Sequence, residues 1–229
     1  MLLSRHPGHV YLGHRMVNSA ANLDYEPAVL SLVAHLFRQR QYPDPKLEKL
    51  RAKFRRIVDQ GRNPNALALH GMILHIAVRN EVDAVAAFRR ALEVGIENNT
   101  RVAGFKWTAA ADFEWAADCY YLLGKILAKR HGQKKEAMSL LEKAALELDF
   151  PEAYYELAML LDKDGPDGRW VQYMIKAAAN GVPNAATELG VWFGRPQEPA
   201  TGYLSKFLSL RRVQASAEWH RVSSPGVAL

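Results

Sequence analysis

The chain has 229 residues, of which 49% are hydrophobic and 24% are charged, a composition typical of a globular protein with a core of its own. Its one cysteine, Cys119, excludes an internal disulfide, and its apolar runs are far shorter than the ~20 residues of a membrane-spanning helix. Lys and Arg together number 30 against 24 for Asp and Glu, so the net charge of +6 favours acidic partners.

The N-terminal residues 1–23 carry Arg5 and Arg15 but no acidic side chain, as a mitochondrial presequence does. Pro7 and Gly8 interrupt the helical periodicity early, so residues 1–15 are predicted to form a flexible segment. The expected location is intracellular and cytoplasmic, with a mitochondrial location as the alternative.

Apolar periodicity and turn residues predict a series of helices with short connections. In chain order these helices cover residues 16–22, 27–40, 45–60, 64–78, 81–94, 113–130, 133–148, 151–162, 169–180, 183–193 and 205–222. Residues 16–193 are predicted to form one helical array, with an insertion at 95–112. Residues 194–229 are predicted to be a linker and a partial terminal repeat helix.

The predicted helix over 45–60 lies in the most basic part of the chain. Residues 38–62 contain nine basic and three acidic side chains, so this segment alone accounts for the net charge of +6. Its apolar residues share one helical face: Leu47, Leu50, Phe54, Ile57 and Val58. The remaining surface is either a solvated face or a patch for an acidic partner or an RNA backbone, with Lys49, Lys53 and Arg56 as the candidate contacts. No aromatic side chains interleave with these charges to stack bases, which weakens the RNA interpretation.

One sequence phrase recurs along the chain: a small residue, a leucine four positions later and another small residue one position after that. We call the first small residue of each phrase its anchor, and the anchors are Ala28, Ala66, Cys119, Ala153 and Ala185. A second phrase, which ends in small residues, precedes most anchors. Together they predict a helix–turn–helix unit of about 34 residues that must stack on its neighbours to bury its apolar face.

Several segments resemble Sel1-like repeats, a branch of the tetratricopeptide superfamily. They are Lys176–Ala185, Glu188–Gly190, Tyr120–Gly124 and Tyr154–Ala158, with an echo of the second-helix motif at Ala217–His220. The spacing is irregular before residue 115, and the resemblance is weaker over 16–80. It implies an all-α fold, a right-handed α-solenoid of helix-turn-helix repeats, used as an adaptor or scaffold and not as a catalyst.

Tyr120, Tyr121, Tyr154 and Tyr155 occupy equivalent positions on two successive first helices, which line the concave groove in this superfamily. Paired tyrosines in such a groove could form a ladder of rigid contacts for a peptide. In the alternative, one tyrosine of each pair packs in the core and the other covers it.

The remaining polar candidates predict no catalytic, cofactor or metal site. His70 stands where other repeats have leucine, so a hydrogen-bonded core histidine is expected, and its spacing from His75 does not suit a shared metal. Cys119 occupies an anchor and is expected to be a small buried side chain. Asp162–Gly168 lacks the spacing of a calcium loop, so it is predicted to be a turn.

The function predicted from these features is a non-enzymatic protein-interaction scaffold that binds a partner helix or extended peptide in the concave groove. The alternative is an RNA-associated organellar helical repeat protein that uses the basic helix 45–60. The repeat array lacks polar capping repeats, which favours self-association or continuation of the array in another chain.

Overall fold

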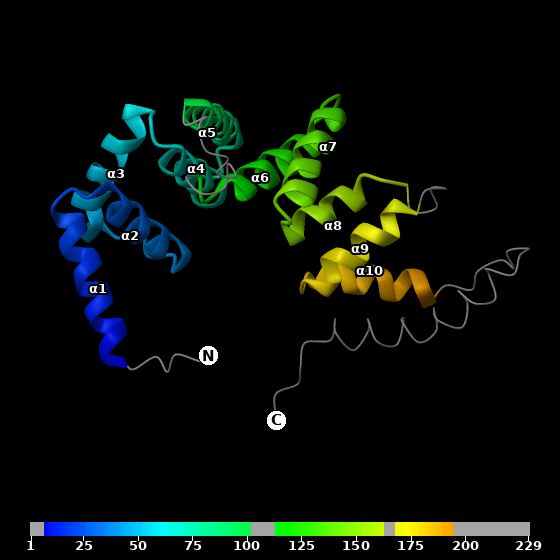
Figure 1. Cartoon of the computed structure of the whole chain (residues 1–229), viewed down its shortest axis with the longest axis horizontal. Coiled ribbons are helices and arrows are strands. Elements are labelled where there is room, and N and C mark those ends of the chain that lie inside the picture. Colours follow the sequence, from blue (N-terminus) through cyan, green and yellow to red (C-terminus); the bar gives the residue numbers. More distant parts are fainter. Residues whose placement is uncertain (1–6, 102–112, 163–167, 195–229) are drawn as a thin grey trace, which may run out of the picture. The chain divides into compact units, whose positions relative to one another are not determined.

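The computed structural model describes residues 7–101, 113–162 and 168–194, and every regular element among them is helical (Figure 1). The chain divides into two compact units, residues 1–119 and residues 120–229. None of the described helices is long and apolar enough to cross a membrane. The helix predicted over 205–222 and the repeat echo at Ala217–His220 lie outside the described residues.

The first unit is a succession of helices that pack on their chain neighbours. Its elements are α1 (Pro7–Asn22), α2 (Glu26–Arg38), η1 (Pro45–Leu47), α3 (Glu48–Gln60), α4 (Pro64–Ile73), the π-helical turn η2 (Leu74–Val78) and α5 (Glu81–Arg101). α1 packs against α2, α2 against α3 and α4 against α5, while α2 also contacts α4. This is the nearest-neighbour packing that the repeated helix pairs predict.

The second unit continues the same pattern. Its elements are α6 (Ala116–Ala128), which begins just before the division, α7 (Lys134–Glu142), the π-helical turn η3 (Lys143–Glu147), α8 (Pro151–Met159), α9 (Arg169–Ala179) and α10 (Pro183–Gly194). One core joins α7 to α10, and its largest fully buried side chains include Trp170, Tyr154 and Met174. The all-α fold of helix pairs predicted from the sequence is therefore confirmed for the described residues, whereas the right-handed superhelix stays a prediction.

The starts of the first helices follow directly from the sequence. Pro64, Pro151 and Pro183 each open a helix, where a missing N–H removes no intrahelical hydrogen bond. Asn63 caps α4, because its Oδ1 accepts a hydrogen bond from the backbone N–H of Ala66 at 3.1 Å. Gly181 adopts a left-handed φ of 86° between α9 and α10, a conformation that glycine reaches without strain.

Two helix boundaries differ from the prediction. α1 begins at Pro7 and not at residue 16, because a proline at the first helical position starts a helix as readily as it breaks one further on. α5 continues through Arg101, so the segment predicted as an insertion from residue 95 is helical at first. Gly95 lies inside α5, and a Cβ there would come 2.7 Å from the ring of Phe113. This glycine serves close packing and does not end the helix.

Glycines five residues after the anchors allow paired helices to approach closely. A Cβ on Gly71 of α4 would lie 2.6 Å from the ring of Phe88 on α5. A Cβ on Gly124 of α6 would lie 2.8 Å from the side chain of Leu141 on α7. The close approach predicted at this repeat position is therefore confirmed in both units.

We predict that Gly71→Ala destabilises the protein. The new methyl group overpacks the α4–α5 contact, which costs about 1–3 kcal/mol, while the better helix propensity of alanine returns at most about 1 kcal/mol. Urea unfolding followed by circular dichroism measures the change. In a Phe88→Leu background Gly71→Ala should cost less, because the ring atoms that meet the methyl group are gone. Equal stability of Gly71→Ala and wild type would contradict this account.

Candidate functional site

The first helices of the repeats, α2, α4, α6, α8 and α10, share a register set by the anchors. Side chains two, three and six positions after an anchor lie on one side of the helix, which we call the first-helix face. On α2 these are Leu30, Ser31 and Ala34; on α6, Tyr121, Leu122 and Lys125; on α8, Tyr155, Glu156 and Met159; and on α10, Thr187, Glu188 and Val191. Findings on one helix can therefore be compared with the same positions on another.

In the first unit this face is hollowed by a cavity of about 200 Å³, which we call the first-helix pocket. Its lining residues are Pro27, Leu30, Ser31, Ala34 and Arg38 of α2, Asn63 and Asn65 at the start of α4, and Glu114 and Trp115 just before α6. The backbone N–H of Trp115 donates to Oδ1 of Asn65 at 3.4 Å. That contact holds the pocket's aromatic wall against the start of α4.

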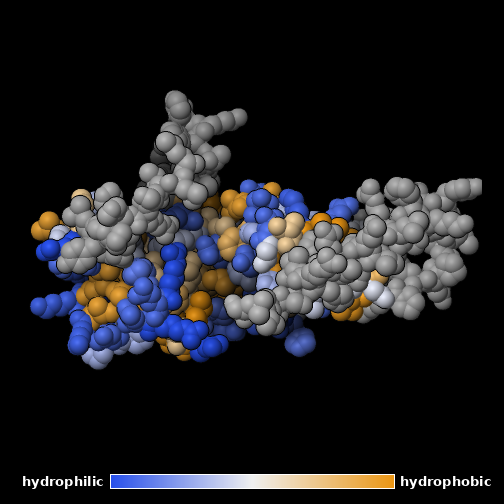
Figure 2. Space-filling view, turned by 90° about the horizontal axis from the view of Figure 1, so that it is seen from below, coloured by the Kyte–Doolittle hydropathy of each residue, from blue (hydrophilic) through white to orange (hydrophobic). Residues whose placement is uncertain are grey.

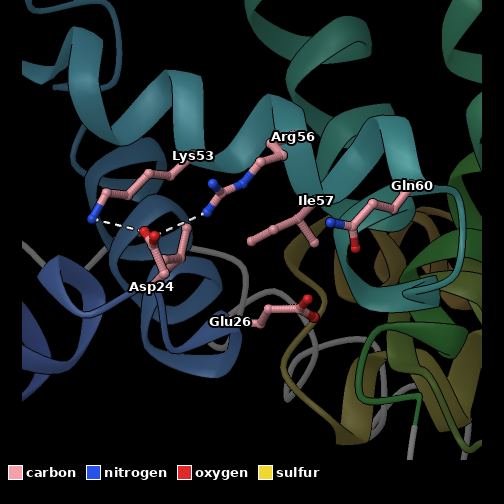
Figure 3. A pocket seen from close by; sticks show the side chains of 7 residues that line it. Asp24, Glu26, Lys53, Arg56, Ile57 and Gln60 are labelled. Carbon is pink, nitrogen blue, oxygen red and sulfur yellow. Dashed lines mark ion pairs between the residues drawn. The ribbon is translucent and has the colours of Figure 1, made fainter.

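A second cavity of about 210 Å³ lies between the α1–α2 turn and α3. Figure 3 shows Lys53 and Arg56 reaching from α3 toward Asp24, while Glu26 lies below Ile57. Asp24 pairs with Nζ of Lys53 at 2.9 Å and with a terminal nitrogen of Arg56 at 3.1 Å. The hydrogen bonds from Lys53 and then Arg56 lower the pKa of the Asp24 carboxyl below its ordinary value of 3.8.

Lys53 also caps the C-terminal end of α1. Its Nζ donates to the backbone carbonyls of Ala21 at 2.9 Å and of Asn22 at 2.8 Å. These are carbonyls of the last helical turn, which have no intrahelical donor and carry the negative end of the helix dipole. Lys53 and Arg56, predicted as partner contacts, are thus used inside the unit to hold α3 against the end of α1.

The rest of the basic helix is also largely compensated. Arg51 pairs with Glu48 at 2.5 Å and donates to the backbone carbonyls of Tyr42 and Asp44, and Arg55 contacts the same glutamate. Phe54 and Ile57 are buried, as the predicted apolar face requires. Lys49 is exposed and forms no ion pair with another residue in the described part of the chain. It is the predicted contact of this helix that stays available.

In the second unit Tyr154 is almost fully buried, with 1% of its surface exposed. Its hydroxyl donates to Oδ1 of Asp149 at 2.9 Å and accepts from Nζ of Lys176 at 2.7 Å. The ammonium group also lies 4.6 Å from the centre of the tyrosine ring, a cation–π distance. Tyr154 therefore joins α8 to α9 and to the turn before α8, a position that fits the core-packing alternative.

The two units repeat one electrostatic contact, which we call the aspartate–lysine tie. Asp24 and Asp149 each stand four residues before an anchor, in left-handed turns with φ of 62° and 50°. Each accepts a lysine from the second helix of the same repeat, Lys53 on α3 or Lys176 on α9. The tie holds the turn before a first helix against the second helix of the same repeat.

Lys125 links two successive first helices. Its Nζ lies 2.6 Å from Oε1 of Glu156 on α8 and donates to the hydroxyl of Tyr121 on its own helix at 3.0 Å. Partial burial lowers the pKa of Lys125, but the hydrogen bonds to Glu156 and Tyr121 outweigh it and raise that pKa above its ordinary value. The Tyr121 ring packs 5.1 Å from the ring of Phe150. Tyr121 is therefore held in place at the first-helix face.

The other two tyrosines are half-buried. The ring of Tyr120 lies 5.5 Å from Nζ of Lys143. Burial raises the pKa of Tyr155, helped by the nearby carboxylates of Glu188 and Glu156. Tyr155 shares the first-helix face with two exposed apolar side chains, Met159 at 45% and Val191 at 46%. Figure 2 shows that hydrophobic and hydrophilic surface alternate over the described part of the chain in this view.

The residues considered for catalysis have surroundings that suit packing. His70 is half-buried with its ring 6.4 Å from that of Phe54, and burial lowers its pKa. Cys119 is completely buried, as predicted, and burial raises the pKa of its thiol well above the ordinary value. Within the described residues no three His, Cys, Asp or Glu side chains are grouped to hold a metal ion. Residues 163–167, which make up most of the predicted turn Asp162–Gly168, lie outside the described residues.

Sequence reasoning missed two features, the first-helix pocket and the aspartate–lysine tie. A signal for the tie is present, because Asp24 and Asp149 occupy the same place before their anchors and a lysine follows in each second helix. The pocket has no comparable signal, since Arg38, Asn65 and Glu114 come from three separated segments.

The class of protein that these observations define is an all-helical repeat protein. No protein-family model matches the chain, and no curated protein matches it in sequence. Among solved structures, the crystal structure of a Sel1 repeat protein from Oxalobacter formigenes is similar over 96% of this chain and 96% of its own, with 17% sequence identity and a TM-score of 0.40.

We predict that the aspartate–lysine ties make stability depend on pH and salt. Because the pKa values of Asp24 and Asp149 are lowered by folding, the ties contribute fully above about pH 4 and are lost as pH falls through the folded-state pKa values. The urea midpoint of the wild type should therefore drop on acidification below pH 4 more than that of an Asp24→Asn/Asp149→Asn variant. Both side chains are exposed, so 1 M salt should reduce the difference.

Asp59→Asn is the control for that experiment, because Asp59 is an exposed carboxylate of α3 outside either tie. It should keep the acid sensitivity of the wild type. A double variant with the same pH profile as this control would show that the ties do not contribute.

Proposed function

We propose that this protein is an interaction scaffold that binds a segment of a partner protein along its first-helix face. The observation that carries the proposal is the pair Met159 and Val191, which are each nearly half exposed at the same repeat position of the first-helix face, the face that also carries Tyr155. Methionine adapts to irregular apolar surfaces, and tyrosine supplies a large contact area with little conformational freedom to lose. Such a combination suits a protein partner.

The electrostatics favour a protein over an RNA partner. Asp24 is shared by Lys53 and Arg56 and offsets one of their two positive charges, so the positive field of the basic helix is weaker than its composition implies. On the first-helix face of the second unit, Lys125 is likewise paired with Glu156. A nucleic-acid surface instead requires uncompensated cations along the path of the backbone.

Site-specific photo-crosslinking tests this proposal. A photoreactive amino acid replaces Met159, and crosslinked partners are identified by mass spectrometry and then purified. The matched control places the same group at Ile175 of α9, which is 41% exposed but lies on a second helix. We expect a defined partner to crosslink from Met159 and much less from Ile175.

The purified partner then allows a direct affinity measurement. Met159→Glu should weaken binding about tenfold or more, because a charge replaces an apolar contact in the interface, while Ile175→Glu should change it little. Equal crosslinking from both positions, or equal effects of the two substitutions, would overturn the assignment of the first-helix face. A crosslinked RNA in place of a protein would overturn the scaffold proposal.

A further inference from the structure

The first-helix pocket of the first unit has a mixed lining of apolar, polar and charged side chains. Leu30 and Ala34 of α2 line it together with Trp115, which has 8% of its surface exposed. Arg38 and Glu114 are exposed lining residues, and neither forms an ion pair with another residue of the described part of the chain. By contrast, the cations around the other cavity of this unit, Lys53 and Arg56, are already paired.

The size of the pocket selects the kind of ligand. Sites for cofactors and drug-sized molecules enclose roughly 300–1,000 Å³. This cavity holds about 200 Å³, so it suits a single side chain and not a whole cofactor. A side chain of a protein segment is the ligand that fits.

We propose that the first-helix pocket binds an extended peptide segment through one apolar side chain, with an acidic residue of the peptide placed at Arg38 and a basic residue placed at Glu114. The inference rests on the proposed scaffold function and names the chemistry of the partner at this site. The apolar side chain contacts Leu30, Ala34 and Trp115. The two charges set the register of the peptide and discriminate against segments with the wrong charge order.

The length of the recognised segment follows from helix geometry. The stripe of α2 from Pro27 to Arg38 is roughly 16 Å long at 1.5 Å per residue. An extended peptide covers that length in about five residues. The proposed recognition unit is an acidic, an apolar and a basic residue within a segment of about this length.

Fluorescence anisotropy with labelled peptides tests the proposal on the full-length protein. The probes are Gly-Glu-Ser-Leu-Ser-Lys-Gly and the charge-exchanged Gly-Lys-Ser-Leu-Ser-Glu-Gly, since the direction of the chain is open. One order should bind, and replacing its leucine with alanine should weaken it about tenfold or more, because an apolar side chain leaves the pocket.

Charge reversal in the protein identifies the pocket as the site. Arg38→Glu should weaken the preferred peptide roughly threefold to tenfold, and changing the peptide's glutamate to lysine should restore binding to that variant. Lys134→Glu makes the same change of charge at an exposed position of α7 outside the pocket and should leave the affinity unchanged. Circular dichroism melting curves confirm that the variants remain folded.

The outcomes separate this inference from the proposed function. If neither peptide binds, or if Arg38→Glu and Lys134→Glu act alike, the pocket proposal is overturned while a partner crosslinked at Met159 would still support the scaffold. If a labelled oligouridine binds and displaces the peptide, the pocket is a nucleic-acid contact and the proposal is likewise overturned. Failure of the Met159 crosslink concerns the scaffold function itself.

Discussion

Close contact between paired helices is the constraint on which the rest of this structure depends. At Gly71 and Gly124 there is no space for even one methyl group between a first helix and its partner. The contact fixes how far apart the helices lie and how each is rotated about its axis. Because the same register recurs after each anchor, the side chains two, three and six positions later lie on the first-helix face of α2, α6, α8 and α10. On α4 the equivalent Ala68 and Leu69 are buried in the core.

The composition suggests that the excess of basic residues serves a partner, but in the structure many of them form ion pairs within the first unit. Residues 38–62 carry the whole net charge, yet four of their cations pair with only two carboxylates, Asp24 and Glu48. The Asp24 pairs hold the short α1–α2 turn against α3, and the Glu48 pairs hold the first turn of α3. Each exposed ion pair of this kind contributes little to the free energy of unfolding, but the two aspartate–lysine ties lie where a first helix begins. Four of the nine basic residues thus stabilise the repeat, whereas Arg38, Arg40, Lys46, Lys49 and Arg62 form no ion pair with another described residue.

Sequence reasoning predicted most helices because their signals are local. Prolines at helix starts, small residues at anchors and turn glycines act within a few residues, so α4, α8 and α10 were placed closely. It was wrong about the start of α1 and the end of α5, where Pro7 and Gly95 each allow two interpretations that only the packed structure separates. The partners of Lys53 and Tyr154 were missed, because each contact joins one helix to another helix or to a turn and the repeated placement of aspartate and lysine is their one sequence signal.

The two units use the same register for different surfaces, and side-chain size explains the difference. On α2 the positions are Leu30, Ser31 and Ala34, and the short side chains of the last two leave a hollow beside Trp115. In the second unit Tyr121 and Lys125 of α6 and Tyr155 and Glu156 of α8 occupy these positions, and the longer side chains of Lys125 and Glu156 meet between the two first helices. Short side chains at these positions therefore leave a hollow, whereas longer ones fill the space between successive first helices.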